Sequence, residues 1–546
     1  MMTARKKGVI AAGAAMLLML SGCTIQTADT RESAVSSVQM AAFNQDLEPV
    51  TREDHYRTTY EIFVYSFCDS NGDGIGDLNG IRSKLDYIQD LGFDELWLTP
   101  VHPSDTYHKY DVKDYCAIDS QFGTMEDYEA LLKDCHERGM RVLLDLPVNH
   151  TASGHSWFQE AASYYRSLPA GSKPDPAVCP YAEYYLFSDS QQEGYAQLAG
   201  SSWYYEARFW SEMPDLNLSN EAVRNEIKDI VSFWLNKGAD GFRLDAVTSY
   251  YTGDPESNVD FMRWFTNTCK EIKPDCYIVG EAWTDRRSIA VLYESGIDSL
   301  FDFPFADSEG IIRSVLNNAY SAKDYVQAML STQEAFSASN PNYVDAPFYT
   351  NHDMARNAGF YPQDNGPKTK MAYAMSLLMS GNSFVYYGEE IGMKGSGKDE
   401  NKRAPMYWSN DPNDPDLCAG PPYMDQVDMK FPPLSEQMSD PLSIYNWFKE
   451  VIKVRKAFPV IASGTTAEAG GISDDAIAAF IRYREGEDPV LIVMNLRDES
   501  RDADLTVLNE ELNLAAVLNT DEQSITIDQG ILHMPAYSIA VLTEVH

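Results

Sequence analysis

Residues 220–247 read NEAVRNEIKDIVSFWLNKGADGFRLDAV, and they join a helix pattern to a short strand pattern. Apolar residues recur at three- and four-residue spacing as far as Gly238, which predicts an amphipathic helix that ends at a glycine. The run GFRL at 241–244 follows at once, and its short length and apolar residues indicate a strand. A helix that leads directly into a strand is the repeating unit of parallel α/β folds.

The same alternation of strands and helices continues along the chain from about residue 60. Strands are expected at 60–67, 95–98, 141–146, 241–244, 277–279, 299–303, 346–349 and 384–387. Strands that alternate with helices form parallel βαβ units, and eight such units predict a (β/α)₈ barrel, the TIM-barrel architecture. We therefore expect an α/β protein with a barrel over residues 55–461.

Two segments do not follow this alternation. Residues 149–214 connect the third strand to the helix near 220, and they are rich in Tyr, Trp, Ser and Gly. A connection of this length is too long for an ordinary loop, so we expect an inserted subdomain.

Residues 462–546 contain short alternating apolar runs, such as AIAAFIRYR, separated by turn residues. This pattern predicts a C-terminal antiparallel β-sandwich domain.

The beginning of the chain has the features of an export signal. A basic cluster at 5–7 precedes an apolar run at 8–20, which is shorter than the about 20 residues of a membrane-spanning helix. The run ends in LSGC, which resembles the bacterial lipoprotein box, so residues 1–22 are expected to be cleaved and Cys23 to carry a lipid anchor. Residues 23–54 lack sustained periodicity and are expected to tether the folded body to the membrane at the bacterial cell surface.

The charge balance disfavours one large class of partners. The 546 residues include 82 Asp and Glu against 43 Lys and Arg, a formal net charge of −39. Such an excess of negative charge repels phosphate backbones, so no nucleic-acid partner is expected.

The cysteines after Cys23 are odd in number and lack CxxC spacing. They support neither a complete disulfide framework nor a structural zinc site.

Polar residues cluster where the predicted strands end, which is where (β/α)₈ barrels build their active sites. The third strand ends in DLPVNH, the fourth in GFRLDAV, the fifth in GEAW and the seventh in TNHD. The chemically active residues in these motifs are Asp145, Asn149, His150, Arg243, Asp245, Glu281, His352 and Asp353. Four correlated strand ends favour one shared site over separate salt-bridged residues.

Three of these residues fit the chemistry of a retaining glycosidase. Arg243 and Asp245 are two apart on a strand and point to the same side, where the cation keeps the carboxylate ionised, as a nucleophile requires. Glu281 follows the apolar run YIVG, an environment that raises the pKa of a carboxyl toward that of a general acid. Carboxyls on adjacent strands can lie about 5 Å apart, which is the spacing in retaining enzymes.

The four motifs, in this order and spacing, resemble the main sequence regions of the α-amylase family, glycoside hydrolase family 13. GFDELWLTP at the second predicted strand, MPDLN and YGEEIGM are also similar to that family. The resemblance implies that Asp245 is the nucleophile and Glu281 the general acid/base. It implies that Asp353 holds the sugar hydroxyls and favours the distorted ring.

The resemblance also implies which residues bind the sugar next to the cleaved bond. His150, Arg243 and His352 would contact it, and Tyr110 in YHKYDVKDY would stack on it, with Asp111 bracing the loop. The substrate class that follows is α-glucan, in the form of starch or maltooligosaccharides. An aromatic content of 12% suits such a substrate, because the apolar faces of pyranose rings stack on aromatic side chains.

The segment DSNGDGIGD at 69–77 is the clearest metal signal. Oxygen side chains at alternate positions, with glycines that permit tight turning, can surround a hard cation at about 2.3–2.6 Å. The segment resembles the start of an EF-hand loop, although Gly80 stands where that loop has its final Glu, and several family members carry it as a calcium site. A structural Ca²⁺ is therefore expected, with a solvated turn as the alternative. The expected ligands are Asp69, Asn71, Asp73, Ile75 and Asp77.

Further residues bear on which bond is cleaved. DSNGDGIGDL and KRAPMYW at 402–408 resemble the oligo-1,6-glucosidase branch, whose exo-acting members carry an Asp three positions before the stacking Tyr. This chain has Tyr107 at that position, which is closer to neopullulanases and amylases, and Ala246 after the nucleophile also favours an α-1,4 preference. We expect retaining hydrolysis of α-1,4-glucosidic bonds through a covalent glycosyl-enzyme intermediate.

Three alternatives remain open on the sequence alone. A 4-α-glucanotransferase would intercept the same intermediate with a sugar hydroxyl instead of water. An α-1,6-acting oligoglucosidase would differ only in the bond that it selects. A non-catalytic glucan-binding lipoprotein is disfavoured because Asp245, Glu281 and Asp353 are all present.

Overall fold

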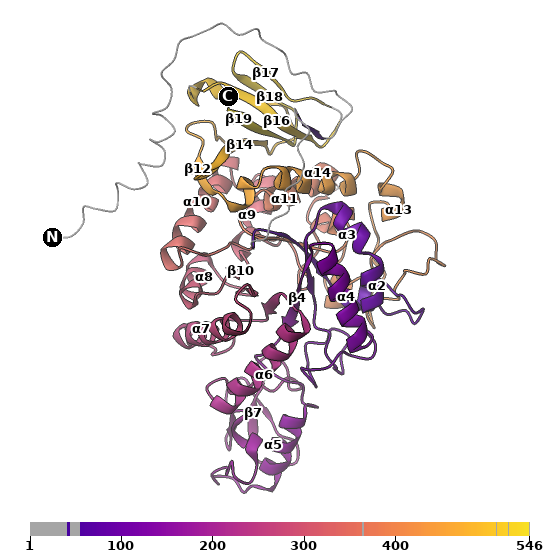
Figure 1. The fold of residues 1–546 in the computed structure, drawn as a ribbon, viewed down its shortest axis with the longest axis vertical. Helices are drawn as coiled ribbons and strands as arrows, with labels where there is room; N and C mark the ends of the chain where they lie inside the picture. The colour runs from indigo at the N-terminus through magenta and orange to yellow at the C-terminus, as the bar shows by residue number, and fades with distance from the viewer. Residues whose placement is uncertain (1–40, 44–54, 363–364, 509, 522, 545–546) are drawn as a thin grey trace, which may run out of the picture.

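A curled parallel sheet lies at the centre of the molecule (Figure 1). The structure is a computed structural model, and it describes residues 41–43, 55–362, 365–508, 510–521 and 523–544. The strands of the sheet run in the order β10-β9-β8-β4-β3-β2-β11, and neighbouring strands pair in parallel. Their bounds are Thr58–Ile62 (β2), Glu95–Leu98 (β3), Arg141–Leu146 (β4), Gly241–Leu244 (β8), Tyr277–Gly280 (β9), Ser299–Leu300 (β10) and Ser383–Tyr386 (β11).

One further segment closes this sheet into a barrel. Phe301, just after β10, pairs with Ala346, and Phe348 pairs with Phe384 in β11, each through an isolated parallel bridge. Residues 346–348 therefore occupy the position between β10 and β11 where the sequence predicts its seventh strand. The predicted (β/α)₈ barrel is confirmed.

The first barrel strand differs from its prediction. The sequence predicts a strand over 60–67, but β2 ends at Ile62 and Val64–Ser66 form a 3₁₀ helix, η1. The main chain there bonds to a loop instead of a strand, because the Gly76 amide donates to the Tyr65 carbonyl at 2.8 Å. The apolar run stays buried in either conformation, so its pattern does not distinguish them.

Helices alternate with the strands and cover the outside of the barrel (Figure 1). They are α2 (Leu78–Ser83), α3 (Leu85–Leu91), α4 (Met125–Glu137), α6 (Glu221–Lys237), α7 (Pro255–Ile272), α8 (Arg286–Leu292), α9 (Ile311–Leu316), α10 (Ala322–Ser339), α11 (Gly366–Leu377), α12 (Asp399–Lys402), α13 (Leu434–Gln437), α14 (Ile444–Ala457) and α15 (Val460–Ser463). In α6, Asn220 caps the first turn through the Ala222 amide, and Gly238 ends the helix at φ 109°. In the described part of the chain, no helix is both long and apolar enough for a membrane crossing.

The segment between β4 and α6 forms a small subdomain at one end of the barrel (Figure 1). It contains α5 (Ser156–Ser167), a 3₁₀ helix η2 (Pro180–Glu183) and a sheet in the order β5-β7-β6. The strands of that sheet are Phe187–Ser188 (β5), Tyr195–Gln197 (β6) and Tyr204–Glu206 (β7). Trp203 is buried in its core, with its indole N–H donating to the Leu168 carbonyl, whereas Trp210 is exposed.

The C-terminal region forms two antiparallel sheets around a separate core. One sheet has the order β1-β16-β19-β14-β13-β12, and the other has the order β15-β18-β17. The bounds are Ala41–Phe43 (β1), Thr465–Glu468 (β12), Ile477–Arg484 (β13), Glu487–Asn495 (β14), Arg501–Asp504 (β15), Leu512–Asn519 (β16), Thr526–Asp528 (β17), Ile531–Met534 (β18) and Ser538–Glu544 (β19). Apolar residues from both sheets, such as Val493 and Leu532, share one cluster. The predicted β-sandwich is confirmed.

The structure covers little of the predicted N-terminal segments. Cys23 and residues 1–22 lie outside the described residues, as does most of the predicted tether at 23–54. Within that tether, the main chain of β1 pairs with β16 at the edge of the larger C-terminal sheet. The segment before the barrel therefore contributes a strand to the domain that follows it.

Candidate active site

Arg243 is the centre of a charged cluster at the carboxyl ends of the barrel strands. It belongs to β8, and its side chain is fully buried. Its Nη1 lies 3.0 Å from Asp145 Oδ1 and 2.8 Å from Asp245 Oδ1. Its Nη2 lies 3.0 Å from Glu281 Oε1. One planar guanidinium thus joins carboxylates from the ends of β4, β8 and β9.

The positive charge of Arg243 is stable in this environment. Burial lowers its pKa, but the carboxylates of Asp145 and Glu281, among others, outweigh burial and raise the pKa well above its ordinary value. The guanidinium also lies 5.0 Å from the ring centroid of Trp97, within cation–π distance. Asp245 keeps 14% of its side chain exposed, so this carboxylate is paired with a cation and still accessible to a substrate.

Glu281 has the environment of a general acid. Burial raises the pKa of the Glu281 carboxyl, and the negative charges of Asp245 and Asp353 raise it further. The Arg243 cation lowers it in part, and the resulting pKa is about 7. Its Oε2 also accepts a hydrogen bond from the Ala246 amide at 3.0 Å. A carboxyl with a pKa near 7 can donate a proton and take one back at neutral pH.

The turn after β8 aims a main-chain amide at this acid. Ala246 adopts φ 44°, in the left-handed region that costs a non-glycine residue about 1–3 kcal/mol. In that conformation its N–H points to the Glu281 side chain, and the Val247 amide donates to the Glu281 carbonyl at 3.0 Å. The strained residue therefore ties the strand end of Asp245 to the strand end of Glu281.

His352 is a second buried cation in the cluster. Its Nδ1 lies 2.6 Å from Glu61 Oε1, and its Nε2 lies 3.1 Å from Asp353 Oδ2. Burial lowers the pKa of His352, but these two carboxylates raise it to about 10, so the ring is charged at neutral pH. Asp353 also receives a hydrogen bond from Arg403 Nη2 at 2.7 Å.

The two cations hold Asp353 in its ionised form. Burial alone raises the pKa of Asp353, but His352 and Arg403 outweigh it and lower the pKa well below its usual range. The Asp353 side chain is 32% exposed. It therefore presents a charged carboxylate to the opening of the barrel, where it can accept hydrogen bonds from a ligand's hydroxyl groups.

Tyr110 joins the two halves of the cluster. Its hydroxyl donates to Asp145 Oδ2 at 2.8 Å and accepts from His352 Nε2 at 2.7 Å. Its ring stacks on His352 with an interplanar angle of 12°. His150 donates from Nε2 to the Tyr110 carbonyl at 3.2 Å. Burial lowers the pKa of His150, so its imidazole ring is neutral at pH 7 and acts as a hydrogen-bonding group.

The structure brings together the residues that the sequence predicts for catalysis and sugar binding. They are Tyr110, His150, Arg243, Asp245, Glu281, His352 and Asp353. The prediction did not include Glu61, Trp97 or Arg403. Glu61 was detectable as an acidic residue inside the apolar run TTYEIF, whereas Trp97 resembles an ordinary core residue and Arg403 comes from a loop distant in sequence.

The predicted metal loop is a chain of tight turns. Asp69 accepts hydrogen bonds from the amides of Asn71, Gly72 and Gly74 at 2.9, 2.7 and 2.7 Å. The Asp73 amide donates to the Asn71 side chain at 3.0 Å. Gly72 and Gly74 have φ 84° and 86°, which a side chain would disfavour.

The donor set of this loop fits a hard cation, but its carboxylates do not form a cage by themselves. Asp69, Asn71, Asp73 and Asp77 offer oxygen ligands, which Ca²⁺ prefers. Within the described ranges, no group of three or more His, Cys, Asp or Glu side chains is arranged to hold a metal ion. A bound ion would therefore also need the amide oxygen of Asn71 and a main-chain oxygen, such as that of Ile75.

Asn149 bonds to a carboxylate at the edge of the inserted subdomain. Its Nδ2 donates to Asp215 Oδ1 at 3.1 Å, and the Arg208 amide donates to Asp215 Oδ2 at 3.1 Å. Burial raises the pKa of Asp215 to about 7. These bonds join the end of β4 to the inserted subdomain.

Comparison with known proteins agrees with this architecture. The profile of the alpha amylase catalytic domain matches residues 61–464. Alpha-amylase 3 of Dictyoglomus thermophilum is 39% identical over 443 residues, which are 80% of this chain and 84% of that protein. Oligo-1,6-glucosidase of Heyndrickxia coagulans is 29% identical over 526 residues, with 81% of this chain and 91% of that protein covered. The solved structure of Eubacterium rectale Amy13B has a TM-score of 0.90 and 46% identity, and the match covers 91% of this chain and 97% of that one.

The fold, the charged cluster and these matches define the class of the protein. The chain belongs to the α-amylase family, glycoside hydrolase family 13. It is a glycoside hydrolase of the α-amylase type.

Proposed function

We propose that this enzyme hydrolyses α-1,4-glucosidic bonds in starch and maltooligosaccharides with retention of configuration. The observation that carries the proposal is the Arg243 guanidinium, which contacts Asp245 at 2.8 Å and Glu281 at 3.0 Å. Two carboxylates held by the two arms of one guanidinium fit the about 5–5.5 Å separation of retaining glycosidases. Their environments also differ as the two roles require, since Asp245 is paired and accessible while Glu281 has a raised pKa.

The reaction then follows in two displacements. Asp245 attacks the anomeric carbon while the bond to the leaving oxygen breaks, and Glu281 gives its proton to that oxygen. The product of this step is a glycosyl ester on Asp245. Glu281, now a carboxylate, takes a proton from water as the water oxygen attacks the same carbon, which releases Asp245.

The remaining residues of the cluster hold the sugar. Asp353 accepts hydrogen bonds from its hydroxyl groups, and His352 and Arg403 keep that carboxylate charged. His150 and Tyr110 complete the surface, with Tyr110 fixed by its hydrogen bond to Asp145. Such fixed groups cost little reorganisation when positive charge develops on the ring.

A product profile tests the bond preference. Reducing ends should appear from soluble starch and maltooligosaccharides at a far higher rate than from isomaltose. Activity on isomaltose alone would contradict the proposal and favour the α-1,6 alternative, which the similarity to Oligo-1,6-glucosidase of Heyndrickxia coagulans supports. Products from maltotriose that are longer than maltotriose, with few new reducing ends, would instead indicate a 4-α-glucanotransferase.

We also propose Ca²⁺ as a structural ion at the 69–77 loop. The ligands would be Asp69, Asn71, Asp73, Ile75 through its carbonyl oxygen, and Asp77. An ion there would supply positive charge to a loop that bonds to η1 at the rim of the barrel, and no step of hydrolysis depends on it. Elemental analysis of the dialysed protein, with and without a chelator, tests for it.

Lipid attachment at Cys23 is a further part of the proposal. It rests on the LSGC motif after a short apolar run, and it would hold the enzyme at the cell surface, where large glucans are accessible. Labelled fatty acid should enter the parent protein but not a Cys23→Ser variant. Equal labelling of the two proteins would contradict lipidation at this residue.

A further inference from the structure

Glu61 is a buried carboxylate to which the proposed reaction gives no direct part. It belongs to β2, and its side chain is 1% exposed, which leaves no surface for contact with a substrate. Its Oε1 lies 2.6 Å from His352 Nδ1 and also accepts a hydrogen bond from the His352 amide at 3.3 Å. One carboxylate oxygen therefore fixes both the ring and the main chain of His352.

The other nitrogen of the His352 ring faces the active site. Nε2 lies 3.1 Å from Asp353 Oδ2 and donates to the Tyr110 hydroxyl at 2.7 Å. A hydrogen on Nε2 attracts the Asp353 carboxylate, whereas the lone pair of an unprotonated Nε2 would repel it. The ring is confined by aromatic neighbours, with centroids 5.5 Å from Tyr110 and 6.2 Å from Phe63. The proton on Nε2 therefore decides how His352 acts on Asp353.

Glu61 controls where the protons of this ring lie. A neutral imidazole carries one N–H, and the group that contacts one nitrogen selects the state of the other. Burial lowers the pKa of His352, but the Asp353 and Glu61 carboxylates raise it to about 10. Burial also raises the pKa of Glu61, and His352 offsets that shift only in part. Whether the shared proton lies on Nδ1 or on the Glu61 carboxyl, Nε2 keeps its hydrogen.

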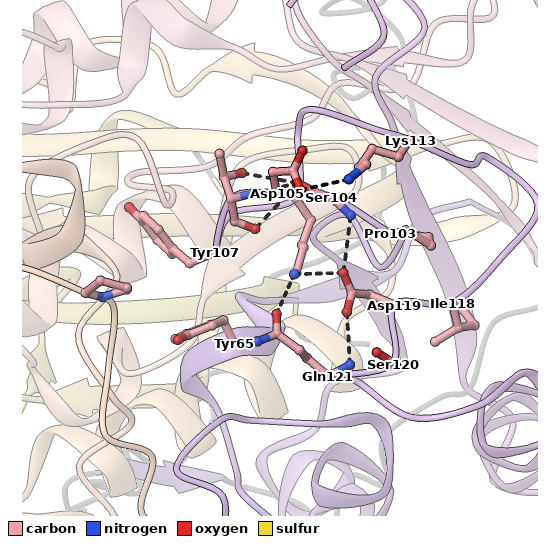
Figure 2. A pocket seen from close by; sticks show the side chains of 13 residues that line it. Tyr65, Pro103, Ser104, Asp105, Tyr107, Lys113, Ile118, Asp119, Ser120 and Gln121 are labelled. Atoms are coloured by element: carbon pink, nitrogen blue, oxygen red, sulfur yellow. Dashed lines mark hydrogen bonds and ion pairs between the residues drawn. The ribbon is translucent and has the colours of Figure 1, made fainter. Parts of the chain in front are cut away.

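The two cations that contact Asp353 differ in how they keep their charge. Arg403 Nη2 donates to Asp353 at 2.7 Å, and a guanidinium stays protonated without help from a neighbour. Its Nη1 donates at 2.8 Å to the Tyr107 hydroxyl, and Tyr107 lines a cavity of about 660 Å³ beside the loop between β3 and α4 (Figure 2). His352 is fully buried, and an imidazole loses its proton far more readily than a guanidinium. The charge of His352 is therefore the one that needs a second carboxylate.

We propose that Glu61 is a positioning residue for the reaction, which keeps a hydrogen on His352 Nε2 and thereby holds Asp353 charged and directed at the sugar hydroxyls. The inference rests on the proposed function, and it adds to the site a residue that the substrate does not touch. Loss of the Glu61 charge should therefore act on the rate through His352 and should depend on pH.

Other ionisable side chains surround the Glu61–His352 pair. They are His108 and Tyr110 in the β3–α4 loop, Asp145 in β4, Arg243 in β8, Glu281 after β9, Asp353, Tyr373 in α11, Tyr386 in β11 and Arg403. Burial raises the pKa of Asp145 to about 6 and that of Glu281 to about 7. Because these groups titrate near neutral pH, the test compares variants with one another instead of reading a single profile.

Cleavage of α-glucosyl fluoride tests the role of Glu61. Fluoride leaves without a proton, so the comparison uses Glu281→Gln, in which position 281 cannot titrate. Glu61→Gln, added to that variant, keeps a hydrogen-bond acceptor but removes one carboxylate that raises the pKa of His352. The ratio of kcat/KM of the double variant to that of Glu281→Gln should be near one at pH 5 and about tenfold lower at pH 9. A ratio that does not change with pH would overturn the proposal.

Glu95→Gln is the matched control. Glu95 is buried in the neighbouring strand β3, where it accepts hydrogen bonds from Thr59 and Asn382. It lies two positions before Trp97, the register partner of Glu61, and thus farther from the strand ends that form the active site. Added to Glu281→Gln, this change should give a ratio that is independent of pH.

A shorter carboxylate separates charge from fit. Glu61→Asp keeps the negative charge, so its ratio to Glu281→Gln should not fall with pH, even where its rate is lower. A fall equal to that of Glu61→Gln would contradict a role for the charge.

A direct measurement at His352 needs no change at position 61. In the ¹⁵N-histidine NMR spectrum of the parent enzyme, the signal that is absent from His352→Gln belongs to His352. Its Nε2 should carry a hydrogen from pH 5 to 9. An unprotonated Nε2 at pH 8 would overturn the proposal, even if Glu61→Gln does not fold.

The choice of substrate separates this inference from the proposed function. α-Glucosyl fluoride contains no bond between sugars, so a preference of the enzyme for α-1,6 bonds would leave the expected ratios unchanged. Asp245→Asn should release no fluoride, because it lacks the nucleophile. Fluoride release by Asp245→Asn at the parent rate would contradict the proposed mechanism, whereas the NMR result at His352 would still decide the role of Glu61.

Discussion

The carboxylates around Arg243 and those of the 69–77 loop accommodate negative charge in opposite ways. At Arg243, acidic groups from β4, β8 and β9 meet a single buried cation. In the loop, the Asp69 carboxylate is satisfied by three main-chain amides that follow it within five residues. The first arrangement needs the whole barrel, whereas the second needs only a short stretch with two glycines.

This difference explains why only one of the two regions is suited to catalysis. Long-range pairing places Asp245 and Glu281 in different environments, and the pKa of Glu281 rises to about 7 through burial. Local pairing leaves Asp69 with hydrogen bonds from main-chain amides of its own loop. A buried carboxyl with a raised pKa beside an accessible, cation-paired carboxylate marks a site for acid and nucleophile, whereas amide-satisfied carboxylates mark a structural turn.

Replacement of Asp245, the proposed nucleophile, should have the largest effect. In Asp245→Asn the side chain keeps its size but cannot form a glycosyl ester, so kcat on soluble starch should fall by about 10⁴-fold or more. Asp229→Asn, on the exposed face of α6, is the control and should retain parent activity. Turnover of Asp245→Asn near the parent level would refute the nucleophile assignment.

Disruption of the guanidinium should be the next most severe change. In Arg243→Lys, one ammonium cannot replace the two arms that contact Asp245 and Glu281. Misplacement of the two carboxylates should lower kcat/KM by about 10²-fold. Arg263→Lys, in a surface pair with Asp260, should leave it unchanged. Equal activity of the two variants would contradict a positioning role for Arg243.

The pH profile sharpens the assignment of the acid. As the proposed acid, Glu281 must be protonated to act, so kcat/KM should decrease about tenfold per unit as pH rises above its pKa of about 7. Glucosyl fluoride needs no proton for its leaving group, so Glu281→Gln should cleave this substrate without that alkaline decrease. Persistence of the decrease in Glu281→Gln would assign it to another group.

Changes at the 69–77 loop should have the smallest effect. They should alter the stability of the enzyme instead of its rate. Removal of Ca²⁺ should lower the melting temperature of the parent enzyme by about 1 °C for each kcal/mol of binding energy lost, because the unfolding entropy of a chain of this size is large. Asp77→Asn can still accept the Gly80 amide that caps α2, so it tests the charge alone. In that variant the chelator should have little effect. An unchanged melting temperature in the chelated parent would contradict a structural ion.

The sequence by itself determined the order of the barrel elements and the composition of the site. Apolar periodicity located strands such as 95–98 and 141–146, because a buried strand must be apolar wherever it lies in the barrel. Strand-end motifs identified Arg243, Asp245 and Glu281, because parallel strands present their carboxyl ends at one face. These properties are local, so each stretch of chain carries its own signal.

Only the tertiary structure decided the partners of those residues. Glu61 and His352 are 291 positions apart, and Tyr107 and Arg403 are 296 apart, so neither pair leaves a trace in local spacing. The same holds for the strand that residues 41–43 add to the C-terminal sheet and for the cavity beside Tyr107. Periodicity reports which side of an element is buried, whereas contacts between distant elements exist only after the barrel closes.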